Sequence, residues 1–116
     1  MKYRRWQIRL AVLNPVVGSE QGKTRPVIII SDDDANDILK VVNVLPLTSR
    51  KPGRDVYPNE ALIGGGSFGL QNDSSVLCQQ IRTLDEQRFV KLYGAINVPA
   101  LQAKIITALK FQLALT

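Results

Sequence analysis

The sequence places one arginine and two hydroxyl residues at the same end of two neighbouring predicted strands. Arg25 directly precedes the mainly apolar run 26–31, and Thr48 and Ser49 directly follow the run 41–47. The two runs are consecutive and their connection is short, which favours an antiparallel pair. In such a pair the start of the first strand lies beside the end of the second. We therefore expect a guanidinium and two hydroxyls to converge at one end of the sheet.

This combination of groups suits chemistry at a phosphodiester. Arginine presents paired donors that match phosphate oxygens, and a hydroxyl adds a further donor. Together they can stabilise the extra negative charge of a phosphorane-like transition state. RNA carries its own nucleophile in the neighbouring 2′-hydroxyl, so an enzyme that orients this group needs neither a metal nor a protein nucleophile. The alternative is that Arg25 and Thr48 are ordinary strand-edge residues on the surface.

The residue types that the chain lacks narrow the chemistry further. It contains no histidine and a single cysteine, Cys78. The commonest general base and metal ligand is therefore absent, and so are a Ser-His-Asp triad, an internal disulfide and a zinc site built from several ligands. Cys78 lies in an apolar run and is expected to be a small buried side chain. We expect no cofactor and no metal, so that any catalysis uses arginine, hydroxyls, carboxylates or the backbone.

The charge balance favours a polyanionic partner. The 116 residues carry a formal net charge of +5, and the isoelectric point is near 9.7, as expected of a protein that binds nucleic acid. Basic residues near the start of the chain alternate with Tyr3 and Trp6, which could stack bases. A solvated basic terminus with a half-buried Trp6 is the alternative. The loops beside Arg25 and Thr48 hold the residues that we expect to contact RNA, namely Ser19, Gln21, Lys23, Ser49, Arg50, Lys51 and Arg54.

The remaining pattern predicts one domain, residues 1–116, with several short strands. The continuous β-branched run within 26–31 indicates a strand covered on both faces. Pro58 suggests that the strand around it lies at a sheet edge. A turn or a single helical turn is expected near 32–39, a short helix at 85–92, and a flexible glycine turn at 64–69. The strands are expected at 8–13, 26–31, 41–47, 56–63 and 75–83.

A longer helix is predicted over residues 99–115. Pro99 suits the first helical position, whereas Val98 is a weak N-cap. The helix carries an apolar stripe that we expect to pack on the core, formed by Leu101, Ile105, Ile106, Ala108, Leu109, Phe111 and Leu113. These elements favour a mainly β (α+β) class, a small antiparallel barrel-like sheet with helical additions. No apolar run is long enough to span a bilayer, and we expect a cytoplasmic protein.

An ordered set of motifs resembles the MazF/PemK-type toxins. It comprises Gly18–Ser31, Pro46–Ser49, Ser75–Cys78 and Gln80–Asp85, in this order over nearly the whole chain. The resemblance implies an SH3-like barrel with a C-terminal helix, as in the CcdB, Kid and MazF folds, and a symmetric homodimer. It implies sequence-specific cutting of single-stranded RNA that leaves a 2′,3′-cyclic phosphate and a 5′-hydroxyl. It also implies inhibition by a small, mostly acidic antitoxin whose tail occupies the RNA groove.

The resemblance assigns roles to individual residues. The catalytic arginine of the family corresponds to Arg25, its hydroxyl residue to Thr48, and a glutamine near the RNA path to Gln80. Gln79 stands where many members have an acid that some branches are thought to use as a general base, and a glutamine cannot take a proton. We therefore assign Arg25 to charge stabilisation. Glu20, the nearest carboxylate in sequence, is the expected acceptor of the 2′-hydroxyl proton.

A second departure from the family pattern keeps other functions open. Trp6 and Gln7 stand where many members have Gly-Asp or Gly-Glu. One alternative is a non-catalytic toxin that binds a protein target such as gyrase, as the CcdB toxins do, or a catalytically dead relative. Another is a basic RNA-binding barrel without chemistry, whose binding would fall steeply with salt. The retained Arg25 and Thr48 favour the nuclease.

Overall fold

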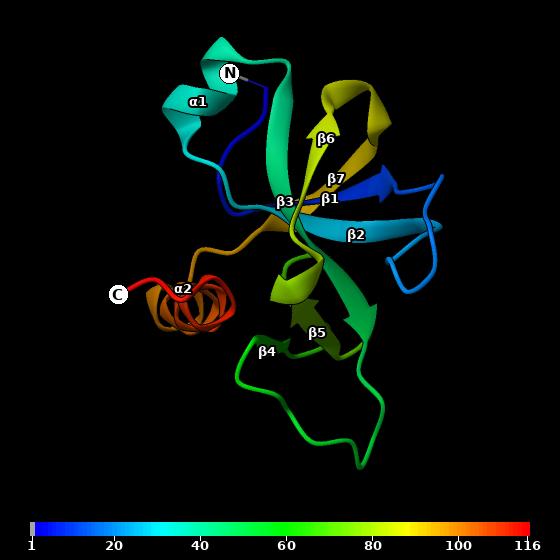
Figure 1. The fold of residues 1–116 in the computed structure, drawn as a ribbon, viewed down its shortest axis with the longest axis vertical. Coiled ribbons are helices and arrows are strands. Elements are labelled where there is room, and N and C mark those ends of the chain that lie inside the picture. Colours follow the sequence, from blue (N-terminus) through cyan, green and yellow to red (C-terminus); the bar gives the residue numbers. More distant parts are fainter. Residues whose placement is uncertain (1) are drawn as a thin grey trace.

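The structure, a computed structural model, describes residues 2–116 and consists mainly of antiparallel strands (Figure 1). One sheet of seven strands has the order β4-β5-β3-β2-β1-β7, and β6 pairs with β3 beside this path. The strands are β1 Gln7–Val12, β2 Thr24–Ile29, β3 Val41–Ser49, β4 Glu60–Ile63, β5 Ser74–Leu77, β6 Arg82–Asp85 and β7 Phe89–Ala95. The helices are α1 Asp33–Ile38 and α2 Pro99–Leu113, with the 3-10 turns η1 Cys78–Gln80 and η2 Glu86–Arg88. The predicted α+β class with a C-terminal helix is confirmed.

Strand β3 organises the sheet because it changes partners along its length. Its first residues pair with β6, its middle pairs with β2, and its last residues, Leu47 to Ser49, pair with β5. The sheet therefore has two parts that share β3, with β1, β2, β6 and β7 in one part and β4 and β5 in the other. Figure 1 shows β4 and β5 below the other strands, with α2 beside them, in a small barrel-like arrangement.

Apolar side chains pack on both faces of β2. Ile28 belongs to one core cluster, Val27 and Ile29 belong to another, and all three are fully buried. Side chains alternate across a strand, which explains this division. The predicted strand covered on both faces is therefore confirmed.

Cys78 is fully buried in the same cluster as Ile28, as predicted. Its burial raises the pKa of the thiol to about 11, so the thiol stays neutral near pH 7.

Helix α2 begins at Pro99 without a side-chain cap, as predicted. Ile105 is fully buried against the core, but Phe111 is 63% exposed and Leu113 is 44% exposed. The predicted core stripe is wrong at these two positions. The helix packs on β4 and η1, which are short elements, so its last turn passes beyond them. Within residues 2–116, no helix is long and apolar enough to cross a membrane.

Two predicted elements are wrong and a third is shorter than expected. Residues 75–83 do not form one strand, because η1 breaks them into β5 and β6, which pair with opposite ends of β3. Residues 85–92 do not form a helix, because η2 is followed by β7, whose backbone pairs with β1. Of the predicted strand 56–63, only Glu60–Ile63 is extended; it lies at the sheet edge as predicted, with Pro58 in the preceding turn.

The glycine turn at residues 64–69 rests directly on β7. Gly69 has a φ of +84°, and a Cβ at this position would lie 2.5 Å from the carbonyl oxygen of Tyr93. A Cβ on Gly94 would lie 2.6 Å from the carbonyl oxygen of Phe68. Real Cβ atoms do not approach backbone so closely, so both positions require glycine. The turn is docked on the sheet, and its glycines provide the close approach.

We expect Gly69→Ala to destabilise the fold more than the matched variant Gly53→Ala. Gly53 has a similar φ of +80°, but nothing lies within 4 Å of its added Cβ. The left-handed backbone should cost each alanine about 1–2 kcal/mol, and the clash should cost Gly69→Ala about 1–3 kcal/mol more. Urea unfolding measures both free energies of unfolding. Equal losses in the two variants would contradict the close approach at Gly69.

Candidate active site

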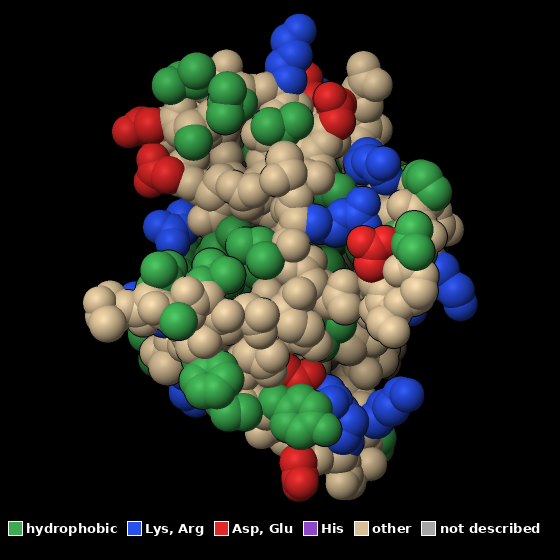
Figure 2. Space-filling model, viewed as in Figure 1, with side chains coloured by type: hydrophobic (Ala, Val, Ile, Leu, Met, Phe, Trp, Pro, Cys, Tyr) green, Lys and Arg blue, Asp and Glu red, His purple; other side chains and the backbone are tan. Residues whose placement is uncertain are grey.

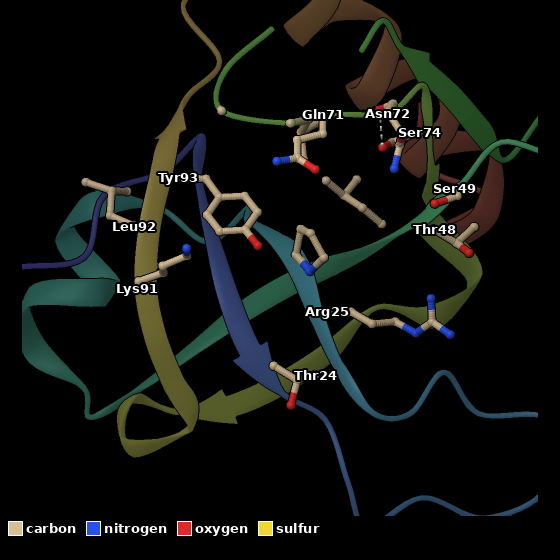
Figure 3. Close-up of a pocket in the computed structure, with 14 residues that line it drawn as sticks. Thr24, Arg25, Thr48, Ser49, Gln71, Asn72, Ser74, Lys91, Leu92 and Tyr93 are labelled. Atoms are coloured by element: carbon tan, nitrogen blue, oxygen red, sulfur yellow. Dashed lines mark hydrogen bonds between the residues drawn. The ribbon is translucent and has the colours of Figure 1, made fainter. Parts of the chain in front are cut away.

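Strands β2 and β3 bring Arg25 and Thr48 to one hollow. Their antiparallel register pairs Val27 with Pro46, and two further steps along it place Arg25 opposite Thr48. Both residues line a hollow of about 540 Å³, and Figure 3 shows them on the same side of it. The strand geometry predicted this convergence. The other lining residues are Thr24, Pro26, Leu47, Ser49, Gly69, Leu70, Gln71, Asn72, Ser74, Lys91, Leu92 and Tyr93.

Neutral groups of the loop between β1 and β2 hold the guanidinium of Arg25. Nε of Arg25 donates a hydrogen bond of 2.9 Å to the carbonyl oxygen of Gly22. With the Gln21 amide turned so that its oxygen faces the guanidinium, this oxygen lies 2.6 Å from Nε and within 3.1 Å of both Nη1 and Nη2. Among the described residues, no carboxylate forms an ion pair with Arg25. The loop therefore orients the guanidinium without neutralising its charge.

Gln80 holds this loop in place. Its Oε1 accepts a hydrogen bond of 3.1 Å from the backbone N–H of Gln21, and its Nε2 donates one of 3.2 Å to the carbonyl oxygen of Ser19. The turn η1 fixes Gln80 between β5 and β6, so a distant part of the sheet orders the loop that orients Arg25. In the structure Gln80 thus positions the loop, whereas the neighbouring Gln79 is exposed.

Glu20 lines a second hollow, of about 460 Å³, which shares no lining residue with the first. One oxygen of its carboxylate accepts a hydrogen bond from the backbone N–H of Val17, which closes the loop on itself. The structure therefore does not bring Glu20 into the hollow that holds Arg25 and Thr48. The other residues that line this second hollow are Ser19, Gln79, Gln80, Ile81 and Arg82.

The basic residues predicted to contact RNA divide into three exposed cations and one ion pair. Lys23, Arg50 and Lys51 are exposed on the loops that flank the hollow. Arg54 instead donates at 2.6 Å to the carboxylate of Glu60, whose side chain is only 1% exposed. A buried carboxylate needs such a partner, so Arg54 is engaged in the fold. On the face shown in Figure 2, lysines and arginines lie mainly along the side of the β1–β2 and β3–β4 loops.

The aromatic residues near the N-terminus are used by the core. Tyr3 is only 7% exposed and its ring contacts that of Phe89, while Trp6 packs partly buried against the core. The guanidinium of Arg9 lies 4.6 Å from the centre of the Tyr3 ring, and that of Arg5 lies 5.3 Å from the centre of the Trp6 ring. The structure therefore favours a half-buried basic terminus over base stacking in this segment.

The wall opposite Arg25 contains residues that sequence reasoning missed. Lys91 and Tyr93 lie two residues apart on β7, and Nζ of Lys91 is 5.2 Å from the centre of the Tyr93 ring. Gln71 and Asn72 approach from the loop before β5 (Figure 3). The pair Lys91 and Tyr93 was missed because residues 85–92 were predicted to be a helix. Residues two apart lie on the same face in a strand but not in a helix. The β-branched and aromatic residues in the run 89–93 were the available signal for a strand.

The polar groups of the hollow suit an anion. Its guanidinium, ammonium and hydroxyl groups are donors that match phosphate oxygens. None of the described residues that line it is acidic. Throughout residues 2–116, no group of three or more His, Cys, Asp or Glu side chains is placed to hold a metal ion. The donors that line the hollow can bind a phosphodiester.

Sequence comparison identifies the family. The model of the PemK-like, MazF-like toxins of type II toxin–antitoxin systems matches residues 4–113. The chain belongs to this family. The resemblance based on the ordered motifs is thereby confirmed. The "Endoribonuclease EndoA" of Bacillus subtilis (strain 168) is 34% identical over 115 residues, which cover 99% of this chain and 97% of that protein. The "Endoribonuclease MazF" of Staphylococcus saprophyticus is 42% identical over 85 residues, covering 73% and 70% of the two chains.

Solved structures of PemK/MazF toxins share the fold. An endoribonuclease in complex with its cognate antitoxin, from Mycobacterial species, superposes with a TM-score of 0.78 at 25% sequence identity. The match covers 98% of this chain and 97% of that chain. The small barrel-like α+β architecture is therefore that of the PemK/MazF family from one end of the described chain to the other.

We expect Gln80→Ala to loosen the loop that carries Gln21, because it removes both hydrogen bonds from the Gln80 side chain. A bond worth about 1 kcal/mol corresponds to roughly fivefold faster amide exchange, so hydrogen exchange at the Gln21 amide should accelerate by at least this factor. Gln79→Ala is the matched control, since no hydrogen bond of the Gln79 side chain is present in residues 2–116. The same exchange rate in both variants would contradict the positioning role of Gln80.

Proposed function

We propose that this chain is a toxin endoribonuclease that cuts single-stranded mRNA at specific sequences without a metal. The 2′-hydroxyl oxygen of one nucleotide attacks the adjacent phosphorus, and the bond from phosphorus to the 5′ oxygen breaks as the new bond forms. One proton leaves the 2′-hydroxyl and one is delivered to the 5′ oxygen. The products are a 2′,3′-cyclic phosphate and a 5′-hydroxyl. The observation that carries this proposal is the un-neutralised guanidinium of Arg25 in the same hollow as Thr48.

Arg25 is assigned to charge stabilisation, with Thr48 as a second donor. A guanidinium stays protonated in proteins, so it is poorly suited to remove a proton. Its partners Gln21 and Gly22 are neutral, which leaves its charge available to phosphoryl oxygens as negative charge develops. The Thr48 hydroxyl can donate to another of these oxygens from β3. Donors that are already oriented need little reorganisation during the reaction.

Glu20 is our proposed acceptor of the 2′-hydroxyl proton. None of the described residues that line the hollow is a carboxylate, so a carboxylate base has to come from an adjacent loop. Glu20 is the acidic residue of the loop 13–23, next to Gln21. To reach a bound RNA its side chain has to release the N–H of Val17, at a cost of about 1 kcal/mol.

The RNA strand is proposed to follow the loops that flank the hollow. Exposed lysines and arginines neutralise phosphates, so binding should weaken as salt concentration rises. Arg54 contributes less attraction, because the Glu60 carboxylate compensates its charge. The remaining proposed contacts are Ser19, Gln21, Lys23, Ser49, Arg50, Lys51 and Gln80.

We further propose that this chain acts in the cytoplasm as a homodimer and is inhibited by a cognate antitoxin protein. The mycobacterial relative was solved with its cognate antitoxin, which supports the inhibitor. The resemblance to the family supports the dimer, and mRNA as substrate supports the cytoplasm. The relatives named endoribonucleases support the nuclease over a non-catalytic toxin that binds a protein target.

Arg25→Ala should lower the cleavage rate about 10²–10³-fold, the usual effect of removing one oriented donor from a transition state. The assay is sequencing of the ends of single-stranded RNA cut by the purified protein in EDTA. Lys40→Ala, which removes an exposed cation before β3, is the matched control and should cut normally. Loss of cleavage in EDTA would reject the metal-free mechanism. Intact RNA together with tight capture of a protein target would favour the non-catalytic toxin.

Glu20→Gln should reduce the cleavage rate about 10²–10⁴-fold, because the amide cannot accept the proton that a general base removes. The amide oxygen can still accept the hydrogen bond from Val17, so thermal stability should stay that of the parent protein. Single-turnover cleavage and a melting curve on the same sample separate the two effects. An unchanged cleavage rate would rule out Glu20 as the base.

A further inference from the structure

Tyr93 and Lys91 form a wall of the hollow on the side away from Arg25. Figure 3 shows the Tyr93 hydroxyl directed into the hollow from the side opposite to Arg25. One side of the Tyr93 ring packs against the core, so the ring is only partly exposed, whereas Lys91 is exposed. A ring held in this way presents its remaining surface at a low cost in conformational entropy.

This wall is built before any ligand arrives. The backbone of the loop before β5 lies against β7 because Gly69 leaves room for the carbonyl group of Tyr93. The backbone N–H of Gly65 donates a hydrogen bond of 2.7 Å to the carboxylate of Asp73, which ties the two ends of this loop together. Gln71 belongs to the loop, and Figure 3 shows its amide near Tyr93 at the upper side of the hollow. The backbone that carries Gln71 therefore has a fixed position relative to β7.

The chemistry of the wall matches one nucleotide of a single strand. An aromatic ring stacks on the face of any base, and cations beside it follow the phosphate backbone. An amide offers one donor group and one acceptor, which can read the edge of an unstacked base. The hollow of about 540 Å³ falls within the range of roughly 300–1,000 Å³ that small-ligand sites occupy.

We propose that Tyr93, Lys91 and Gln71 form a nucleotide subsite that binds the base beside the cleaved phosphate and sets the sequence preference at that position. The exposed Lys91 ammonium, which lies over the Tyr93 ring in the free protein, moves to a phosphate and leaves the ring to stack on the base. The Gln71 amide reads the base edge. This inference rests on the proposed nuclease function, and it assigns to β7 a task that the Arg25–Thr48 pair does not perform.

The test uses a random-sequence pool of single-stranded RNA and the full chain. Gln71→Ala should flatten the nucleotide preference at one position next to the cut and leave the other positions unchanged. Its matched control is Gln87→Ala, an exposed glutamine between β6 and β7. Sequencing of the cut ends gives the preference at every position.

Kinetics on one RNA from this pool separate stacking from catalysis. Tyr93→Leu keeps an apolar side chain against the core but removes the ring, and it should raise KM about tenfold, within the range expected for loss of one stacked base. Tyr93→Phe should stay within about twofold of the parent KM, since a phenyl ring stacks equally well. Lys91→Gln should raise KM and reduce its salt dependence, whereas Lys40→Gln should do neither.

The outcomes distinguish this inference from the proposed function. If Arg25→Ala cuts as fast as the parent protein, the catalytic assignment fails. If Arg25→Ala is inactive but Gln71→Ala keeps the full sequence preference and Lys91→Gln keeps its KM, the subsite alone is overturned. These two variants change exposed residues, so they decide the matter even if Tyr93→Leu does not fold.

If the parent protein does not cut the RNA pool, measurements of RNA binding still test the subsite. Fluorescence anisotropy then measures binding of a labelled pool of 2′-O-methyl RNA, which cannot be cut. Weaker binding by Tyr93→Leu and Lys91→Gln than by the parent and Lys40→Gln would support the subsite. Equal binding by all four proteins would overturn it.

Discussion

The antiparallel register between β2 and the middle of β3 places Arg25 opposite Thr48, and it is secured by burial on two faces at once. Val27 and Ile28 are neighbours on β2, yet they fill different core clusters and are both fully buried. A slip of one residue would turn every side chain of β2 to the opposite face. The slip would also bring Pro26 or Ser31, which flank the buried residues 27–30, to a fully buried position. The burial that stabilises the fold therefore also fixes the relative position of the guanidinium and the hydroxyl.

Arg25 and Arg54 show how partners give one residue type two different roles. Arg54 contacts the buried carboxylate of Glu60 and neutralises it, which serves stability. Arg25 is held by the neutral Gln21 and by a backbone carbonyl, so its orientation is fixed while its charge stays available. Composition alone treats the two residues alike. The difference lies in whether the oxygen that meets the guanidinium carries a charge.

Sequence reasoning succeeded where an element is determined by its own residues. The β-branched run of β2 and the start of α2 at Pro99 follow from local pattern, and the meeting of Arg25 with Thr48 follows from a short connection between strands. Elements set by distant pairing were missed. Strand β7 is extended because β1 supplies its hydrogen-bond partners, and Tyr93 was overlooked with it. The burial of Glu60 could not be predicted from the sequence either, because no local pattern shows which loop folds over a strand.

Strand β3 also couples the two parts of the sheet energetically. Its residues Val42 and Val44 lie in one core, and Leu45 and Leu47 lie in the other. An intermediate that kept only one part folded would leave an apolar face of β3 in water, at a cost of about 25 cal/mol per Å². Such half-folded species are therefore disfavoured, and unfolding should be all-or-none. A cellular protease then meets either the intact molecule or a fully opened chain, so the lifetime of this toxin depends on its global unfolding equilibrium.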